Sequence, residues 1–543
     1  MLINMRLAEM GYKNMSPENE HLLPDEILPW DDVPADIAIM NKLGDVNEEI
    51  EDAPVKSPLP VYVRAYNTHY ELINYEMEDC PRIEKDFRTW DKLTYKFNPY
   101  YYYDKPRKIL YIPRGYSEAI VSDQTGRPVE KYETGKPKTS VNFTMKSLPR
   151  DDYQAKMIRF LIGDTEFRYL KNAHQQVLTI PTRSGKTFCT IAAIAALHVK
   201  ALIIVNRDML REQWASEITQ HSNLPMTHIC LIKESEFFNP DEKKDSRKLR
   251  FKYIFITTHR TIHNAIERYG IAAIQRTIEY LDIGVKVIDE AHLEFRNTLM
   301  TDYAVNVWKN FYLTATFARS DAQENFIFQK AFNHVAKIAE KNPERQKSVK
   351  LFMIGFRTKP AYIENQMICY RKTGFSRHSY IKYELERPDL DRVVMMILDT
   401  LINKKRIEGK ILLLSSQTTS CDHFEEVIHD YFPSYSVCSH HSKHPVENFR
   451  DYGIICATPG MVGTGTTIPK LRAVINTEPM ASTVNTIQIF GRLDVYAPGF
   501  DTFYFLVSDL GFDKVARMFS KSKQTLAPHA KEIIEWNIGG QKK

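Results

Sequence analysis

The stretch TIPTRSGKTF, residues 179–188, decides how the central part of this chain folds. Residues 177–180 (VLTI) are apolar and predict a short buried strand, whereas residues 188–198 (FCTIAAIAALH) have the composition of a helix. The tripeptide Gly-Lys-Thr at 185–187 connects the two. A strand, a glycine turn and a helix N-terminus form the setting of a phosphate-binding loop, because free N–H groups and the positive end of the helix dipole meet there.

Two side chains of this loop carry the chemistry. Lys186 is expected to reach the β- and γ-phosphates of a nucleotide, and Thr187 to place its hydroxyl on Mg²⁺. The loop lacks the usual earlier glycines, and Arg183 stands where a small residue is expected. Two interpretations of Arg183 stay open: it points to solvent, or it supplies positive charge at the phosphates. The other loop residues expected at the nucleotide are Thr182, Ser184 and Gly185.

A second stretch, GVKVIDEAH at residues 284–292, supplies the carboxylates that such a site needs. An apolar strand runs directly into Asp289 and Glu290, which a simple helix cap would not explain. Asp289 is expected to hold Mg²⁺ opposite the Thr187 hydroxyl, and Glu290 to orient and deprotonate the attacking water. Together the two stretches predict an enzyme that hydrolyses a nucleoside triphosphate.

The remaining sequence predicts two consecutive α/β lobes. Short apolar strands (QVLTI, ALIIV, YIFIT, VKVID) alternate with helices, and a second series begins near residue 347 (VKLFMIGF, KILLLSS, YGIICAT, RAVIN, FYFLVS). Continuous apolar strands between helices indicate parallel sheets covered on both faces. The expected divisions are an acidic, Pro-rich arm (1–60), a small β-rich or α+β accessory domain (61–145), lobe one (146–340), lobe two (341–510) and a helical tail (511–543).

Composition limits the location of the protein. The chain has 543 residues, 43% of them hydrophobic, and no apolar run of the length that a membrane span needs. Its first residues, MLINMRLAEMGYKN, lack the pattern of a secretory signal. Seven cysteines occur without a C-x-x-C pair, which favours a reducing compartment. We expect an intracellular protein associated with nucleic acid, and not a secreted one.

Charge is distributed unevenly along the chain. Residues 1–60 hold 13 acidic and 4 basic residues, a net charge of −9. Since the whole chain has a net charge of +5, the remaining residues carry +14. A basic body predicts a polyanionic partner, which we take to be nucleic acid, either DNA or RNA. Two interpretations of the acidic arm stay open: a solvated terminus, or a segment that competes with nucleic acid or docks a protein partner.

The accessory region contains YKFNPYYYYDKPRKILYIPRGY, residues 95–116, where tyrosines alternate with basic residues. Aromatic rings stack on bases and cations hold phosphates, so Lys105, Arg107 and Arg114 are candidate nucleic-acid contacts. The alternative is that the tyrosines form the core of a small sheet. A further stretch, CSHHSKH at 438–444, has metal-binding residue types, but no second ligand cluster accompanies it and we expect a loop there.

These stretches, taken in order, resemble the motifs of superfamily 2 helicases of the DEAH type. The matching segments are PTRSGKT, VNRDMLREQW, ITTHRTI, DEAH, LTATF, ILLLSSQTTSCDHF, ATPGMVGTGTTIP and QIFGRL, which correspond to motifs I, Ia, Ic, II, III, IV, V and VI. The resemblance covers roughly residues 146–510. It implies two RecA-like lobes, with ATP and Mg²⁺ in the cleft and nucleic acid across the top.

The resemblance also implies roles for single residues. Gln154 would contact adenine, and His292 would couple the ATP site to motif VI, where Gln488 and Arg492 would approach the γ-phosphate from the second lobe. Four residues would face the nucleic-acid backbone: Arg207, Thr258, Thr464 and Gly465. Gly465 would also lie at the nucleotide.

Within the superfamily the sequence is most similar to virus- and phage-encoded members of the UvsW and XPB-like group, which implies a double-stranded or branched DNA substrate and, for a viral protein, the host cell as its location. One departure stands out: Val495 occupies the place of a second motif VI arginine, the finger that stabilises the transition state. We therefore expect an ATP-dependent DNA helicase or translocase. The alternative is a nucleotide-switched assembly or transcription-termination subunit that unwinds little.

Overall fold

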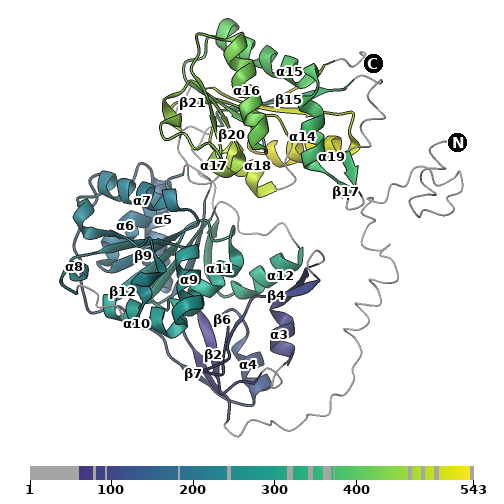
Figure 1. The fold of residues 1–543 in the computed structure, drawn as a ribbon. Coiled ribbons are helices and arrows are strands. Elements are labelled where there is room, and N and C mark those ends of the chain that lie inside the picture. Colours follow the sequence, from purple (N-terminus) through teal and green to yellow (C-terminus); the bar gives the residue numbers. More distant parts are fainter. Residues whose placement is uncertain are drawn as a thin grey trace, which may run out of the picture. The chain divides into compact units, whose positions relative to one another are not determined.

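A seven-stranded parallel sheet forms the first α/β lobe (Figure 1). The computed structural model describes residues 60–76, 81–91, 95–180, 184–240, 246–314, 322–339, 347–358, 369–371, 374–462, 468–478, 483–493 and 501–538. The strands lie in the order β10-β11-β9-β12-β13-β8-β14. Their bounds are β8 Gln175–Thr179, β9 Lys200–Val205, β10 Ile229–Leu231, β11 Ile254–Thr258, β12 Ile283–Ile288, β13 Lys309–Thr314 and β14 Ala336–Ala339.

Helices cover both faces of this sheet, as the continuous apolar strands predict. Alternate residues of one strand point to opposite faces: Ile203 of β9 packs in the core under α5–α7, and Ile204 packs in the core under α9–α11. The helices of this lobe are α5 Asp152–Ile162, α6 Lys186–Leu197, α7 Asp208–His221, α8 Ser246–Arg250, α9 His259–Tyr269, α10 Ile271–Leu281, α11 Phe295–Ala304 and α12 Ala322–Ala331.

The second lobe repeats this architecture, with seven parallel strands in the order β19-β20-β18-β21-β22-β15-β23. Helices α14–α16 pack on one face, and α17–α19 pack on the other. The strands are β15 Val349–Phe356, β18 Lys410–Leu414, β19 Val437–His440, β20 Ile454–Ala457, β21 Leu471–Asn476, β22 Thr502–Asp509 and β23 Glu532–Ile538. The helices are α14 Arg377–Leu385, α15 Pro388–Asp399, α16 Thr418–Tyr431, α17 Pro459–Val462, α18 Thr483–Phe490 and α19 Asp513–Leu526. The predicted fold class of two tandem α/β lobes is confirmed.

Two segments of the second lobe differ from expectation. The stretch 511–543 does not form only a helical tail, because after α19 it supplies β23, which pairs in parallel with β15 along Lys350–Phe356. The His-rich stretch begins as strand β19 and not as a loop, and it pairs with β20. Both strands lie at the edges of the sheet. Edge strands commonly carry polar residues, so β19 and β23 lack the apolar pattern of the central strands, although all four residues of β19 are buried.

The accessory region forms a five-stranded sheet in the order β5-β6-β2-β1-β7, so the expected β-rich domain is present. Its elements are β1 Tyr62–Ala65, β2 His69–Ile73, α3 Pro81–Asp86, β5 Tyr102–Asp104, β6 Ile109–Pro113, α4 Glu118–Thr125 and β7 Val129–Lys131. A separate two-stranded hairpin joins β3 Arg88–Asp91 to β4 Lys96–Pro99. Only Pro60 of the predicted acidic arm lies within the described residues.

The accessory domain and the first lobe share one hydrophobic core. Polar contacts also join them: the Asn67 amide donates to the carbonyl of Val307 at 2.8 Å, and the Thr68 hydroxyl donates to the carbonyl of Asp302 at 2.8 Å. The Tyr303 hydroxyl donates to the carbonyl of Tyr100 at 2.8 Å. Because these contacts are buried, the accessory domain is held in a fixed position on the lobe.

The cysteines and the helices bear on the expected location. The six described cysteines are all free and form no disulfide among themselves; they are Cys189, Cys230, Cys369, Cys421, Cys438 and Cys456. Across the part of the chain that the structure describes, no helix combines the length and apolar character that crossing a membrane requires.

A buried ion pair joins Lys286 and Asp302 next to the shared core. Lys286 of β12 is fully buried, and its ammonium group donates to Asp302 at 2.6 Å and to the carbonyl of Val305 at 2.7 Å. The Tyr312 hydroxyl donates to the same carboxylate at 3.0 Å. Asp302 lies in the last turn of α11, and its carbonyl accepts from Thr68. The pair therefore connects the strand that leads into Asp289 with the accessory domain.

We expect Lys286→Met to lower the free energy of unfolding by about 3–5 kcal/mol, because Asp302 is left as an unpaired buried charge. The double variant Lys286→Met/Asp302→Asn should recover part of this loss, since a neutral amide still accepts from Tyr312. Urea unfolding followed by tryptophan fluorescence measures both. As control, Lys404→Met in the exposed pair with Asp399 should leave the midpoint unchanged. An equally small effect of Lys286→Met would contradict the assignment.

Candidate nucleotide-binding site

The predicted phosphate-binding loop lies at the carboxyl end of β8. After β8, Ile180 is buried, and α6 begins at Lys186. Ser184 is buried, and Thr187 lies half-buried in the first turn of α6. Thr182 and Arg183 lie outside the described residues, so both interpretations of Arg183 stay open. The helix N-terminus therefore stands where the sequence predicts a phosphate.

Gly185 is required at the start of this helix for two reasons. Its φ is 89°, in the left-handed region that glycine adopts without strain. A Cβ atom here would also lie 2.3 Å from Nε2 of Gln154. That amide donates to the carbonyl of Ser184 at 3.3 Å, and its Oε1 accepts from the backbone N–H of Arg150 at 2.9 Å. Gln154 is thus placed against the loop, and its contact with adenine stays a prediction.

Asp289 follows β12 at the same edge of the sheet. Its backbone N–H donates to the carbonyl of Ile204 at 3.0 Å, and its Oδ2 accepts from the indole N–H of Trp214 at 3.0 Å. Burial and the neighbouring Glu290 carboxylate raise the pKa of Asp289 to about 6, while the Lys186 ammonium and the Trp214 N–H oppose this shift. A cation bound beside Asp289 would restore its charged form.

Trp214 is a site residue that the sequence reasoning missed. It lies on α7, within the segment that resembles motif Ia, and is 3% exposed. A buried tryptophan usually finds an acceptor for its N–H, and this was the signal available in the sequence.

Glu290 and His292 form the centre of a polar chain. The Lys186 ammonium lies 3.0 Å from Oε1 of Glu290, and Oε2 of Glu290 lies 3.5 Å from Nδ1 of His292. The same nitrogen of His292 lies 2.7 Å from the hydroxyl of Thr314. Glu290 has a φ of 50°, in the left-handed region. The chain joins the loop before α6, the turn after β12 and the end of β13.

The predicted residues of the second lobe are only partly described. Arg492 follows α18 and is 9% exposed. Gln488 lies within α18, but its side chain is outside the described set. Thr464, Gly465 and Val495 lie outside the described residues. The approach of motif VI to the γ-phosphate therefore stays a prediction.

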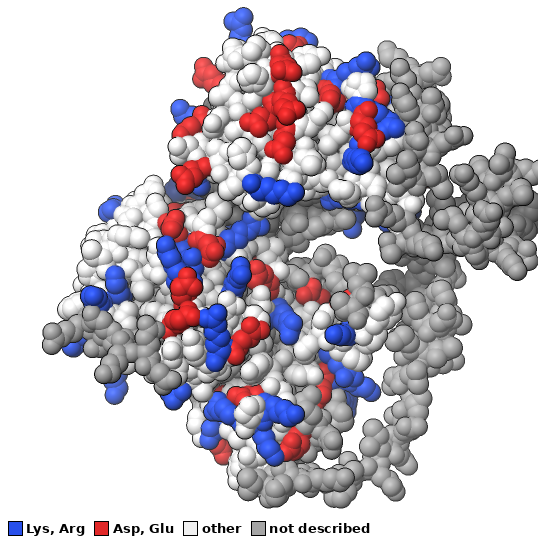
Figure 2. Space-filling model, viewed as in Figure 1, with Lys and Arg blue, Asp and Glu red and all other residues white. Residues whose placement is uncertain are grey.

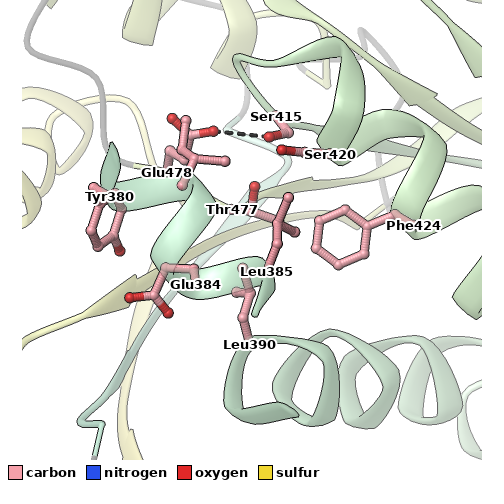
Figure 3. Close-up of a pocket in the computed structure, with 10 residues that line it drawn as sticks. Tyr380, Glu384, Leu385, Leu390, Ser415, Ser420, Phe424, Thr477 and Glu478 are labelled. Carbon is pink, nitrogen blue, oxygen red and sulfur yellow. Dashed lines mark hydrogen bonds between the residues drawn. The ribbon is translucent and has the colours of Figure 1, made fainter. Parts of the chain in front are cut away.

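A second polar cluster lies beside a pocket of the second lobe (Figure 3). The buried carboxylate of Glu478 accepts from the hydroxyls of Ser415 and Ser416, each at 2.9 Å, and from the backbone N–H of Ser416 at 2.9 Å. The guanidinium of Arg377 lies 2.6 Å away. Glu478 thus ties the end of β18 to the end of β21 and to α14. Its signal in the sequence was an acidic residue shortly after an apolar strand.

The residues predicted to face nucleic acid occupy different environments. Arg207 precedes α7 and is half-buried. Burial lowers the pKa of Arg207, and the negative charge of Glu294 opposes this shift. Thr258 is 2% exposed, and its hydroxyl accepts from the backbone N–H of Thr261 to cap α9. Its side chain therefore does not face solvent, because the helix N-terminus uses it. Charges of both signs are interspersed on the face shown in Figure 2, with acidic side chains gathered over α16.

The predicted contacts of the accessory domain are mostly engaged elsewhere. Arg114 donates to the Tyr70 hydroxyl, lies over its ring at 4.6 Å and is 3.5 Å from Glu118, so it is structural. Arg107 lies 3.9 Å from Asp104, whereas Lys105 is exposed. Tyrosines 100–103 are buried or half-buried. The sheet-core interpretation of these four tyrosines is the one that the structure supports.

The His-rich stretch also has a structural explanation. The ring of His440 stacks on Phe449 at 4.1 Å, and Nε2 of His441 lies 2.7 Å from Asp422. Within the described portion of the chain, no group of three or more His, Cys, Asp or Glu side chains is arranged to hold a metal ion.

Comparison with known proteins finds sequence similarity over part of the chain. Residues 147–319 match the family described as the type III restriction enzyme, res subunit. Over 205 residues the chain is 25% identical to the XPB helicase/translocase subunit of general transcription and DNA repair factor IIH from Drosophila melanogaster, which is 36% of this chain and 23% of that protein. Over 157 residues it is 24% identical to the DNA 3'-5' helicase XPB of Kineococcus radiotolerans, which is 29% of this chain and 26% of that protein. The chain thus matches about a quarter of the length of each relative.

Two solved structures are also similar. S. cerevisiae Dbp5 bound to RNA and ADP BeF3 has a TM-score of 0.47 at 12% identity, over 71% of this chain and 89% of that one. The DUF1998 helicase MrfA bound to DNA has a TM-score of 0.45 at 14% identity, over 73% of this chain and 53% of that one. This chain is therefore similar in sequence to XPB helicases over part of its length, and its match to the res subunit family covers residues 147–319.

Proposed function

We propose that this protein is an ATP-dependent motor that acts on double-stranded or branched DNA. The observation that carries the proposal is the polar chain from Lys186 through Glu290 and His292 to Thr314. It connects the phosphate-binding loop with the turn after β12 and with the end of β13. A change at the nucleotide can therefore be passed to other segments of the lobe by contacts already in place.

The residues of the site fit ATP with Mg²⁺. Lys186 and the N-terminus of α6 hold the phosphates, while the Asp289 carboxylate and the Thr187 hydroxyl are hard oxygen ligands of the kind that Mg²⁺ takes. Magnesium is usually held by one or two protein carboxylates together with substrate phosphates, so two protein ligands suffice. When bound, the ion neutralises charge that develops on the phosphates.

The Lys186–Glu290 pair gives the site a defined order of events. Without nucleotide, the ammonium group is held by the carboxylate that serves as the base. A triphosphate in the loop offers Lys186 a partner of greater negative charge. Once Lys186 leaves, Glu290 is able to accept a proton from water, and His292 keeps its carboxylate oriented. The general base is thus released when substrate arrives.

The motifs and the relatives support a finer identity. DEAH at 289–292 favours a DEAH-type enzyme, the XPB relatives act on DNA by their names, and the resemblance to UvsW-like proteins favours a viral or phage origin. The free cysteines favour a location inside a cell, which is the host cell for a viral protein. The acidic arm is a candidate segment for binding a protein partner.

ATP turnover is expected to rise on addition of duplex or forked DNA and to be abolished by two substitutions that act differently. Lys186→Ala should weaken ATP binding, because phosphate charge is lost. Glu290→Gln should retain ATP binding and trap the nucleotide, because the base is lost. Turnover and equilibrium binding of ATP, measured with single-stranded, duplex, forked and RNA ligands, separate these effects.

Lys404→Ala, which removes an exposed lysine outside the site, serves as the matched control and should hydrolyse ATP normally. Wild-type turnover in Glu290→Gln would remove that residue as the base. Turnover that responds to no nucleic acid would refute the motor, and strand separation of a forked duplex distinguishes it from a nucleotide-switched binding subunit.

Trp214→Phe should raise the Mg²⁺ concentration needed for half-maximal turnover by about tenfold, because Asp289 loses the N–H that orients it. Titration of Mg²⁺ at saturating ATP measures the change. Trp308→Phe is the control, since the ring of Trp308 lies near Lys136 and Lys309 and not at the site. An unchanged Mg²⁺ requirement in Trp214→Phe would show that this hydrogen bond does not orient the ligand.

Basal turnover is expected to be low, because Val495 replaces the second motif VI arginine and the transition state lacks one cation. Val495→Arg should raise it. Arg183→Gly should lower it only if Arg183 supplies the missing charge. Steady-state rates of both variants without DNA test this, and fast basal turnover that neither variant changes would contradict the idea that this position limits the chemistry.

A further inference from the structure

The β3–β4 hairpin exposes aromatic side chains that its own fold does not bury. Trp90 and Phe97 are opposite each other in the two strands, with ring centroids 4.8 Å apart, and they are 40% and 51% exposed. Tyr95, which immediately precedes β4, is 76% exposed. Exposed aromatic rings gathered on one element commonly mark a binding surface.

The base of the hairpin is firmly held. Phe87, just before β3, is fully buried and packs edge-on against Tyr116 at 5.1 Å. The backbone N–H of Tyr100 donates to the carbonyl of Phe87 at 2.7 Å, and the Tyr100 hydroxyl donates to Glu324 of α12 at 3.1 Å. An isolated hairpin is marginally stable, so these contacts are what hold the exposed rings in place. Figure 1 shows β4 beside α12.

The charges around the hairpin are suited to a polyanion. The basic residues of this region are exposed or half-exposed, whereas two of its carboxylates are engaged: Glu84 is buried and accepts from the Tyr75 hydroxyl, and Asp86 lies 3.0 Å from Lys330. A third carboxylate, that of Asp91, belongs to the residue opposite Lys96 in the hairpin. The basic residues are Arg82, Lys85, Arg88 and Lys96. The guanidinium of Arg88 lies 4.1 Å from the centroid of the Phe97 ring, so charge and ring occupy the same face.

Helix α12 extends this surface. Phe326 is 66% exposed, and the Lys330 ammonium lies 5.7 Å from its ring and 5.6 Å from the ring of Phe87. Lys330 therefore lies near both the exposed ring of Phe326 on α12 and the buried ring of Phe87 at the base of the hairpin. The exposed aromatic surface of the accessory domain therefore lies on the β3–β4 hairpin and α12, and not at tyrosines 100–103.

We propose that the β3–β4 hairpin binds unpaired bases of nucleic acid, with Trp90 and Phe97 as stacking rings and Arg88 and Lys96 as partners for phosphate. Stacking requires flat exposed rings, and cations beside them hold the backbone. Bases within a duplex are already stacked on each other, so the hairpin selects a single-stranded segment. The inference rests on the proposed function, since it names the part of a branched substrate that the accessory domain holds.

The test compares two fluorescein-labelled oligonucleotides of equal length, one of thymidines and one of abasic sites, which share their phosphates and differ only in bases. Binding of the full chain is followed by anisotropy without ATP. Trp90→Ala/Phe97→Ala should weaken binding of the thymidine strand by about tenfold or more and leave the abasic strand unaffected. Trp90→Phe, which keeps a ring, should retain most of the affinity.

Two further sets of variants complete the test. Tyr169→Ala/Tyr431→Ala removes exposed aromatic residues outside the hairpin and should change nothing. Arg88→Gln/Lys96→Gln should reduce the slope of log affinity against log salt by about 0.7 for each cation removed. Thermal unfolding midpoints identify a variant that has lost its fold. If the alanine variant is unfolded, the affinities of Trp90→Phe and Trp90→Leu for the thymidine strand show whether binding needs an aromatic ring or only an apolar side chain of similar size.

Equal wild-type affinity for the thymidine and abasic strands, or unchanged affinity in Trp90→Ala/Phe97→Ala, would overturn the proposal and leave the hairpin as a surface for protein, such as the acidic arm. Because binding is measured without ATP, its failure is distinct from failure of the motor. An inactive ATPase with intact base-dependent binding refutes only the proposed motor, and an active one without such binding refutes only the hairpin.

Discussion

The site depends on one geometric constraint: parallel strands end at a common edge of their sheet. In the first lobe β8, β12 and β13 are adjacent or nearly so, and each ends in polar residues. More than a hundred positions of the chain separate Lys186 from Thr314. Contacts of 2.7–3.5 Å nevertheless connect them through Glu290 and His292. Strands β8, β12 and β13 are buried along nearly their whole length, so this edge cannot shift without disturbing the core. The fixed strand ends hold these side chains within contact distance of one another.

The accessory domain adds a second constraint, because it is joined to the first lobe by a continuous core and not by a flexible linker. The contacts of Asn67 and Thr68 with the segment after α11 are buried, and the Lys286–Asp302 pair lies directly below them. A domain attached in this way moves together with the lobe that holds the phosphate-binding loop. A substrate segment held on the accessory domain would therefore follow the motions of that lobe.

Much of the fold and part of the site could be predicted from the sequence. Central strands such as β9 and β12 are continuous apolar runs, and polar residues after such strands stand out, so the sequence predicted that Lys186 and Glu290 lie together, and the structure places them 3.0 Å apart. The contact of Trp214 with Asp289 was not predicted, because it depends on how α7 packs and a single tryptophan carries no periodic signal. Thr258 caps α9, since a threonine at a strand end serves equally as a helix cap, and its contact with nucleic acid stays a prediction. The edge strand β23 has a mixed pattern, and only its pairing with β15 shows its place. The tyrosine run was ambiguous because core and surface positions alternate in a strand.

The backbone at Glu290 has a consequence of its own. A glutamate in the left-handed region costs on the order of 1–2 kcal/mol relative to its relaxed conformation, a cost that glycine would avoid. The turn thus stores local strain at the residue that holds Lys186. A chain optimised for stability alone would place glycine or asparagine here. The carboxylate is held in a conformation that disfavours it, so stability is lost locally while the direction of one side chain is fixed. The turn after β12 is therefore a region of local frustration.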